Sequence, residues 1–302
     1  MRDLGVKLAL SVFTLLTLGG TVSLGQDFSG VEVTTTKLAP NLYMLAGAGG
    51  NVGVLVGEEG VFMVDDQYAP MSDKLKAAVA AITEAPLRYL INTHWHFDHT
   101  GGNEAFAESG AVLVAHDNVR VRMSRDEFIG LLDMEVPASP AAALPVITFA
   151  NRLTLHFADA AITAHHVAHA HTDGDAFIHF AEENVIHAGD LFWNGLYPFI
   201  DTSSGGGIDG MIKGARRMLA LADDQTRIIP GHGPLAGRDD LVAYLDMLET
   251  TRARILRLIQ DGVSRDAARF KPILEDYDEK WGGGFMKPER YRTIVYDDLA
   301  RK

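Results

Sequence analysis

A seven-residue stretch, Thr93-His94-Trp95-His96-Phe97-Asp98-His99, constrains this chain more than any other feature. It follows an apolar run and precedes two glycines, and it places four side chains that can bind metal within six residues. On an extended backbone alternate side chains lie on one side, so His94 and His96 can reach the same ion. A turn after them would direct Asp98 and His99 towards a second ion. Because imidazole and carboxylate suit zinc and similar cations, the stretch predicts a metal site at the end of a strand.

Composition and charge narrow the possible partners of the protein. The 302 residues include 40 acidic and 27 basic side chains, which gives a formal net charge of −13. Nucleic acid would require the opposite charge balance, so we expect no nucleic-acid partner and a small-molecule substrate instead. There is no cysteine, so thiolate ligands and disulfides are excluded. An apolar content of 47% is enough for a substantial core.

The first 25 residues have the pattern of a secretory signal peptide. Arg2 and Lys7 precede an apolar run at 8–18, and Ser23-Leu24-Gly25 provides a small-residue cleavage site. The apolar run is short for a membrane span, although an uncleaved anchor is the alternative reading. We expect residues 26–302 to form one domain that is periplasmic or secreted, with no stable membrane insertion after cleavage.

Short apolar runs with helical segments between them indicate an α/β protein. Two series of strands are each followed by helices, which predicts two packed sheets with helices outside, a four-layer sandwich. Residues 124–145 lose periodicity and carry three prolines, so we expect an irregular surface excursion there. The main expected helices cover 72–82, with Ser72 as N-cap, 103–108, 116–123, 208–221 and 239–260.

Further metal-binding side chains follow later strands. His171 lies in Ala-His-Thr-Asp-Gly-Asp, Asp190 ends the strand that begins at Val185, and His232 lies in Pro-Gly-His-Gly. Three neighbouring histidines compete with His171 on sequence alone: His165, His166 and His169.

Taken together, the His-x-His-x-Asp-His stretch and these three motifs resemble the metallo-β-lactamase superfamily over about residues 38–260. The resemblance implies an αββα sandwich and a site with two Zn²⁺ ions. It assigns His94, His96 and His171 to the first ion, Asp98, His99 and His232 to the second, and Asp190 to both. His171 is preferred over its rivals because it precedes a Thr-x-Gly turn, as in the family pattern. Asp65 matches an early strand-end carboxylate, which either supports a ligand or caps a turn.

The resemblance also implies an enzyme, a zinc hydrolase. Two cations would hold a shared water as hydroxide, which attacks the carbonyl of a cyclic amide or ester, as in β-lactamases. Asp98 is the expected catalytic residue because its free oxygen can orient that nucleophile. The bridging Asp190 is also typical of lactonases and phosphodiesterase-type members, which are the alternative. An alternative of another class is a periplasmic metal-binding accessory protein of a quinoprotein system with little hydrolytic activity.

Several residues around the motifs are candidates for the substrate pocket. The hairpin 43–50 is rich in glycine and could be a mobile lid. The run Gly205-Gly206-Gly207 before a helix could either cradle an anion or act as a linker. Aromatic and polar residues beside the ligands could form the walls: Trp95, Phe97, Trp193, Asn194 and Tyr197.

Overall fold

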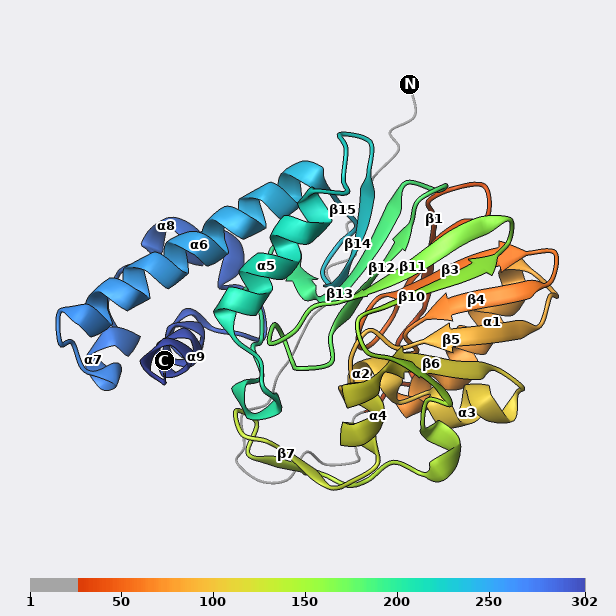
Figure 1. Cartoon of the computed structure of the whole chain (residues 1–302), viewed down its shortest axis with the longest axis horizontal. Helices are drawn as coiled ribbons and strands as arrows, with labels where there is room; N and C mark the ends of the chain where they lie inside the picture. The colour runs from red at the N-terminus through yellow and green to blue at the C-terminus, as the bar shows by residue number, and fades with distance from the viewer. Residues whose placement is uncertain (1–26, 302) are drawn as a thin grey trace.

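The computed structural model describes residues 27–301, and the predicted signal peptide at 1–25 lies outside the described residues. Two sheets pack face to face, and helices cover the outer face of each (Figure 1). The predicted αββα sandwich is confirmed. No helix among the described residues is long and apolar enough to cross a membrane.

The first sheet combines antiparallel hairpins with parallel strands. In spatial order it contains β1 (Thr34–Lys37), β2 (Leu42–Ala46), β3 (Val52–Gly57), β4 (Gly60–Val64), β5 (Leu87–Ile91), β6 (Val112–His116) and β9 (Ile147–Phe149). β1 to β4 pair antiparallel, whereas β5, β6 and β9 run parallel to β4. The carboxyl ends of β4 and β5 therefore meet at one edge of the sheet.

The second sheet follows the same plan in the other half of the chain. In spatial order it contains β10 (Arg152–Phe157), β11 (Ala160–His166), β12 (Ala176–Phe180), β13 (Val185–Trp193), β14 (Arg227–His232) and β15 (Ala236–Gly237). β13 and β14 are parallel, and Trp193 lies opposite His232 at their carboxyl ends. β13 continues through Asp190 to Trp193, whereas the sequence had suggested that it ends at Asp190.

Strand alternation explains the layers. Along β4, Phe62 and Val64 enter the core between the two sheets, while Val61 and Met63 pack against the outer helices. Because successive strand side chains point to opposite faces, a strand that is apolar throughout must be covered on both sides. The second sheet likewise packs its outer face on a third apolar cluster.

The helices occupy the two outer layers and the loops. They are α1 (Ser72–Ile82), α2 (Phe97–Thr100), α3 (Asn103–Glu108), α4 (Asp117–Met123), α5 (Ile208–Leu219), α6 (Arg238–Gln260), α7 (Arg265–Arg269), α8 (Glu275–Trp281) and α9 (Pro288–Ala300). α1 and α3 cover the first sheet, and α5 and α6 cover the second (Figure 1).

Two local predictions are wrong. Met71 is the N-cap of α1, and Ser72 is the first helical residue. The Ser72 hydroxyl donates to Ala69 O in the preceding 3₁₀ turn and does not cap the helix. The segment 124–145 contains two paired strands, β7 (Glu127–Ile129) and β8 (Met134–Val136). We call residues 127–136 the β7–β8 flap.

Candidate metal centre

The ligand residues converge because of where their strands end. His94 and His96 follow β5, and the short helix α2 then places Asp98 and His99 in its first turn. His171 lies in the loop between β11 and β12, while Asp190 and His232 lie on the parallel neighbours β13 and β14. The face-to-face sheets bring both sets of carboxyl ends to one edge of the sandwich.

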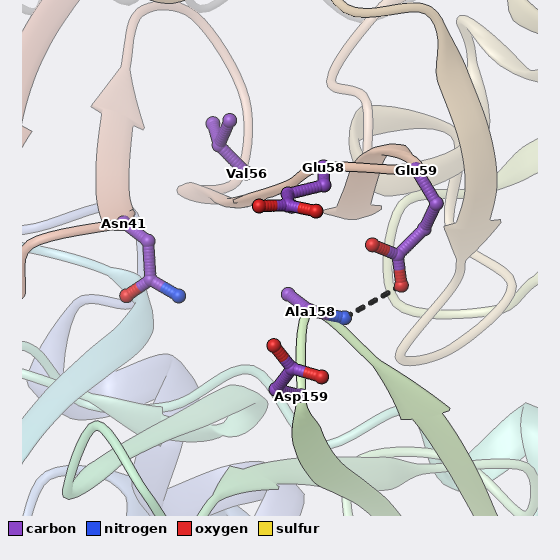
Figure 2. Close-up of a pocket in the computed structure, with 7 residues that line it drawn as sticks. Asn41, Val56, Glu58, Glu59, Ala158 and Asp159 are labelled. Carbon is purple, nitrogen blue, oxygen red and sulfur yellow. Dashed lines mark hydrogen bonds between the residues drawn. The ribbon is translucent and has the colours of Figure 1, made fainter.

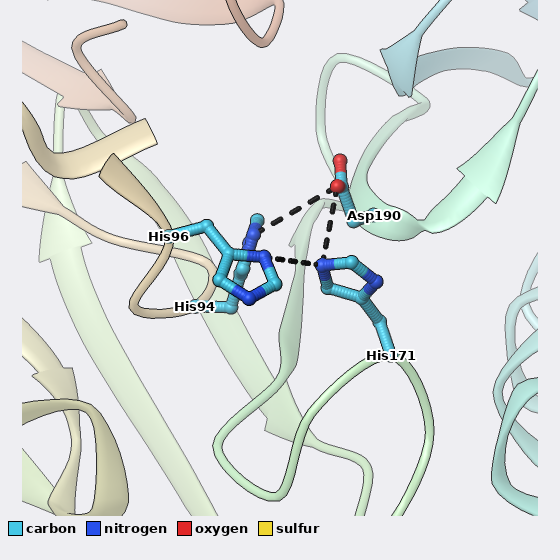
Figure 3. Close-up of side chains that lie close together, drawn as sticks. All are labelled: His94, His96, His171 and Asp190. Atoms are coloured by element: carbon cyan, nitrogen blue, oxygen red, sulfur yellow. Dashed lines mark hydrogen bonds and ion pairs between the residues drawn. The ribbon is translucent and has the colours of Figure 1, made fainter. Parts of the chain in front are cut away.

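The first group of ligands is fully buried. It consists of His94, His96, His171 and Asp190, with one ligand atom of each within 4.8 Å of all the others (Figure 3). His171 Nε2 lies 2.8 Å from His96 Nδ1 and 3.3 Å from Asp190 Oδ2. His94 Nε2 lies 3.8 Å from the same carboxylate oxygen. Three imidazole nitrogens and one carboxylate oxygen thus face a common point.

The second group adjoins the first through Asp190. It consists of Asp98, His99 and His232. Oδ1 of Asp190 lies 3.1 Å from His99 Nε2 and 3.4 Å from His232 Nε2, while Oδ2 faces the first group. Asp98 Oδ2 lies 3.3 Å from His232 Nε2. Asp190 therefore lies between the two groups and presents one oxygen to each.

The ligand histidines are oriented by partners on their outer nitrogens. Asp65 accepts a hydrogen bond from His99 Nδ1 at 2.8 Å, and it also accepts from the backbone N–H and the hydroxyl of Thr93. The other outer partners are the Thr93 hydroxyl for His94, Asp201 for His96 and the Phe199 carbonyl for His171. Such partners fix ring orientation and raise ligand basicity.

The electrostatics of the two groups differ. Burial lowers the pKa of His94 well below its ordinary value and lowers that of His171 to about 4, so both imidazoles are neutral. Burial also opposes protonation of His232, but the carboxylates of Asp190 and Asp98 outweigh it and raise the His232 pKa to about 9. The carboxylates around the second group therefore favour positive charge at this position, and a bound divalent cation would supply it.

The residues fit a pair of bound cations. His94 Nε2 and Asp190 Oδ1 are buried and make no hydrogen bond to any described residue, although buried polar atoms are normally paired. One cation in each group would satisfy these two atoms, and the nitrogen and oxygen donors suit zinc and its neighbours. The chain also packs closely on a ligand at Gly231. A Cβ atom at this glycine would lie only 2.0 Å from Asp190 Oδ1.

The rival histidines lie outside both groups. His166 stacks on His116 with ring centroids 3.7 Å apart, and its Nδ1 contacts Asp175 O. His165 stacks on Phe177, and His169 Nδ1 contacts Gly205 O. The choice of His171 therefore agrees with the positions of all four side chains.

The surroundings of the metal groups differ in part from the expectations. The N–H groups of Gly206 and Gly207 donate to Asp201 O and Ala170 O, so this run cannot cradle an anion with them. The last residue of the expected lid is bonded to its surroundings, since Gly50 N–H donates to Asp98 O and Gly50 O accepts from the Gln67 amide. Trp95 and Tyr197 are buried in the core and do not form pocket walls. Sequence reasoning also missed Asp201, whose surroundings signal only a polar turn.

A hollow of about 430 Å³ lies away from the metal groups and is lined by residues of the β3–β4 and β10–β11 turns, among them Glu58, Glu59 and Asp159 (Figure 2). β3 begins beside the ligand loops, where Asn51 N–H donates to Gly231 O, and ends at this hollow. The hollow is therefore at the opposite edge of the sandwich and contains no ligand residue.

Comparison with known proteins agrees with this geometry. The family model described as the metallo-beta-lactamase superfamily matches residues 46–237, so the chain belongs to this superfamily. A metallo-beta-lactamase from Pontibacter korlensis has the same fold, with a TM-score of 0.60 and 16% identity. That match covers 72% of this chain and 99% of the other.

Two curated relatives are each 26% identical to this chain. The 2,4-dinitroanisole O-demethylase subunit alpha of Nocardioides sp. (strain JS1661) matches over 81% of this chain and 69% of its own length. A hydroxyacylglutathione hydrolase of Polaromonas sp. (strain JS666 / ATCC BAA-500) matches over 54% of this chain and 55% of its own length. The chain thus spans little more than half of the second relative.

Proposed function

We propose that this protein is a dinuclear zinc hydrolase that opens a cyclic amide or ester, with lactams ahead of lactones. The observation that carries the proposal is the pair of adjacent ligand groups that share Asp190. When bound, two cations lower the pKa of a water molecule and polarise the substrate oxygen. The absence of cysteine restricts the ligands to nitrogen and oxygen, which zinc accepts.

Solvent access indicates where the substrate would bind. The side chains of Asp98 and His232 are 18% and 19% exposed, whereas His94, His171 and Asp190 are 3% exposed or less. A substrate would therefore approach from the side of the second group. The partly buried ring of Phe97 lies next to Asp98 and packs at a tilt against the ring of Tyr68, which provides an apolar wall there.

Asp98 is suited to the proton transfers of the reaction. Its Oδ2 faces His99 and His232, and its other oxygen makes no hydrogen bond to the described residues. Burial opposes its ionisation, but His99 and His232 lower its pKa to about 2, so it is a carboxylate at neutral pH. As water oxygen bonds to the carbonyl carbon, Asp98 accepts the water proton. It returns this proton to the leaving nitrogen or oxygen as the ring bond breaks.

A panel of substrates tests the proposal. Protein loaded with two equivalents of zinc is assayed on β-lactams, homoserine lactones and phosphodiesters, each with and without chelator. We expect turnover of a lactam or lactone, its loss with chelator, and a fall in kcat of at least about 100-fold in Asp98→Asn with zinc retained. If loaded protein leaves every lactam and lactone intact, this substrate class is wrong. Cleavage of a phosphodiester would then support the phosphodiesterase alternative, and no turnover of any substrate would support a metal-binding accessory role.

A second candidate rests on the relative matched over most of this chain. Because that relative is named an O-demethylase of 2,4-dinitroanisole, the site could instead replace an activated aryl methoxy group by water. Water oxygen would bond to the ring carbon while the C–O bond to the methoxy group breaks and methanol leaves. Adding nitro-substituted anisoles to the same panel separates the candidates, since a hydrolase limited to lactams or lactones releases no methanol.

We also propose that residues 1–25 are removed on export and that the mature protein is periplasmic or secreted. The basic start, apolar run and small-residue exit of this segment support the proposal. Protein recovered from the periplasmic fraction should have the intact mass of a chain that begins directly after Gly25. A mass that includes Met1 would contradict cleavage.

A further inference from the structure

One short segment, residues 199–207, contacts two ligand histidines that come from different sheets. The Asp201 carboxylate is 1% exposed, and its Oδ2 lies 3.1 Å from Nε2 of His96. Backbone N–H of Asp201 donates to His171 O at 2.9 Å, and Phe199 O accepts from His171 Nδ1 at 2.7 Å. The segment therefore fixes His96 and His171 relative to each other.

The carboxylate of Asp201 is itself held by several donors. Its Oδ1 accepts from the backbone N–H groups of Ser203 and Ser204, at 3.1 and 3.2 Å, and from the Ser203 hydroxyl. Its Oδ2 accepts from the Ser204 hydroxyl as well as from His96. Since an ionised carboxylate can only accept, Nε2 of His96 carries the proton that it donates to Asp201. Nδ1 of His96 faces the first ligand group, 2.8 Å from His171 Nε2.

The same network reaches the β7–β8 flap. Gly130 N–H, at the tip of the flap, donates to the Ser203 hydroxyl oxygen at 3.0 Å, while that hydroxyl donates to Asp201. The two strands of the flap share only the register pairs from Glu127↔Val136 to Ile129↔Met134. A two-stranded ribbon of this size is marginal alone. Its position depends on the packing of Ile129 into the apolar cluster of the second sheet and on the bond of Gly130 to Ser203.

We propose that Asp201 is the positioning residue that holds His96 for the first cation, and that Ser203 connects this support to the β7–β8 flap. Cation binding and flap docking then reinforce each other, because a coupling between two sites is reciprocal. The inference rests on the metal-binding part of the proposed function and on no particular substrate.

Zinc affinity tests the role of Asp201. In a His232→Ala background, where the second group is incomplete, the remaining affinity reports on the first group. We expect Asp201→Ala to weaken the zinc affinity of the first group about 10- to 100-fold, as loss of an outer partner does, and Asp201→Asn to weaken this affinity less. Asp159→Asn, in the distant hollow, should leave it unchanged.

Two further readouts separate positioning from a general loss of folding. Cobalt(II) absorption should change in Asp201→Ala, because it reports ligand geometry, while circular dichroism of the zinc-free protein should match that of the parent. Asp201→Asn, which keeps the side-chain shape, provides the measurement if the alanine variant does not fold. First-group affinity equal to that of the parent in both variants would overturn the proposal.

Hydrogen exchange tests the connection to the flap. Zinc should slow amide exchange over residues 127–136 in the parent, and Ser203→Ala should abolish that protection, whereas Ser124→Ala on exposed surface should retain it. Exchange that is the same with and without zinc in the parent would overturn the coupling. Zinc binding without turnover would contradict only the proposed substrate, whereas a parent that binds no zinc would contradict both proposals.

Discussion

Asp190 is the residue on which both ligand groups depend. Its Oδ2 faces His171 and its Oδ1 faces His99 and His232, so one carboxylate serves two positions. Burial opposes its ionisation, but the surrounding histidines, with His232 first, keep the pKa of Asp190 well below the ordinary value. It is therefore a permanent anion between two sites for positive charge.

Replacing this carboxylate should affect the two cations unequally. In Asp190→Ala we expect the affinity for the second cation to fall by about 100-fold or more, which exceeds the cost of losing an outer partner. The affinity for the first cation should fall less. The physical reason is that the first group keeps three buried, oriented imidazoles, whereas the second is partly exposed. Stepwise chelator titration measures both affinities, with Asp159→Asn as the control. Equal losses at both positions would contradict the bridging role.

At the scale of elements, β5 and α3 are joined by a reciprocal pair of amides. The side-chain N–H₂ of Asn92 donates to Asn103 Oδ1 at 3.0 Å, and that of Asn103 donates to Asn92 Oδ1 at 2.9 Å. Asn103 also donates to Ala143 O, and both residues are fully buried. These bonds hold the end of β5, and with it the start of the ligand loop, against the outer helix layer.

Breaking this pair should destabilise the fold. Asn103→Ala leaves the Asn92 amide oxygen and Ala143 O without partners, and each buried unsatisfied group costs about 1–3 kcal/mol. We therefore expect urea unfolding to show a loss in the free energy of unfolding of about 1–3 kcal/mol or more. Asn151→Ala, on exposed surface, should stay within about 0.5 kcal/mol. A loss in the free energy of unfolding of Asn103→Ala no larger than that of the Asn151→Ala control would show that the pair does not support the loop.

At the scale of the whole molecule, bound cations would connect the two halves of the sandwich. The loop after β5 in the first sheet supplies His94, His96, Asp98 and His99, and the second half of the chain supplies the other three ligands. Without cations, imidazoles and carboxylates from the two halves face one another, and His94 Nε2 and Asp190 Oδ1 have no hydrogen-bond partner among the described residues. Metal binding should therefore stabilise the fold as a whole.

Removing metal should lower the unfolding temperature. A ligand at 100 times its Kd stabilises the folded state by about 2.7 kcal/mol. For a chain of this size, we expect chelator to lower the Tm by roughly 5–10 °C and added zinc to restore it. Differential scanning calorimetry measures the shift, and Asp190→Ala should show a smaller one. Equal Tm values with and without chelator in the parent would argue against cations that join the two halves.

The sequence by itself determined that metal-binding side chains follow several strands and that the fold is α/β. Histidine and aspartate at motif spacing indicate the first, and strand periods of two between helical periods indicate the second. The same patterns failed where a residue had two possible local roles. Ser72 has the composition of an N-cap but bonds back to Ala69, and the glycine run before α5 uses its N–H groups on neighbouring backbone.

Apart from Asp65, which the family resemblance already suggested, only the tertiary structure decided which residues support the ligands. Asp201 reaches His96 across 105 positions in the chain, and Gly130 reaches Ser203 across 73. Such contacts depend on how two sheets and a flap pack together, and no local periodicity or spacing records that packing. The same reason explains why Trp95, which stands between two ligands in the sequence, is buried in the apolar cluster on the outer face of the second sheet.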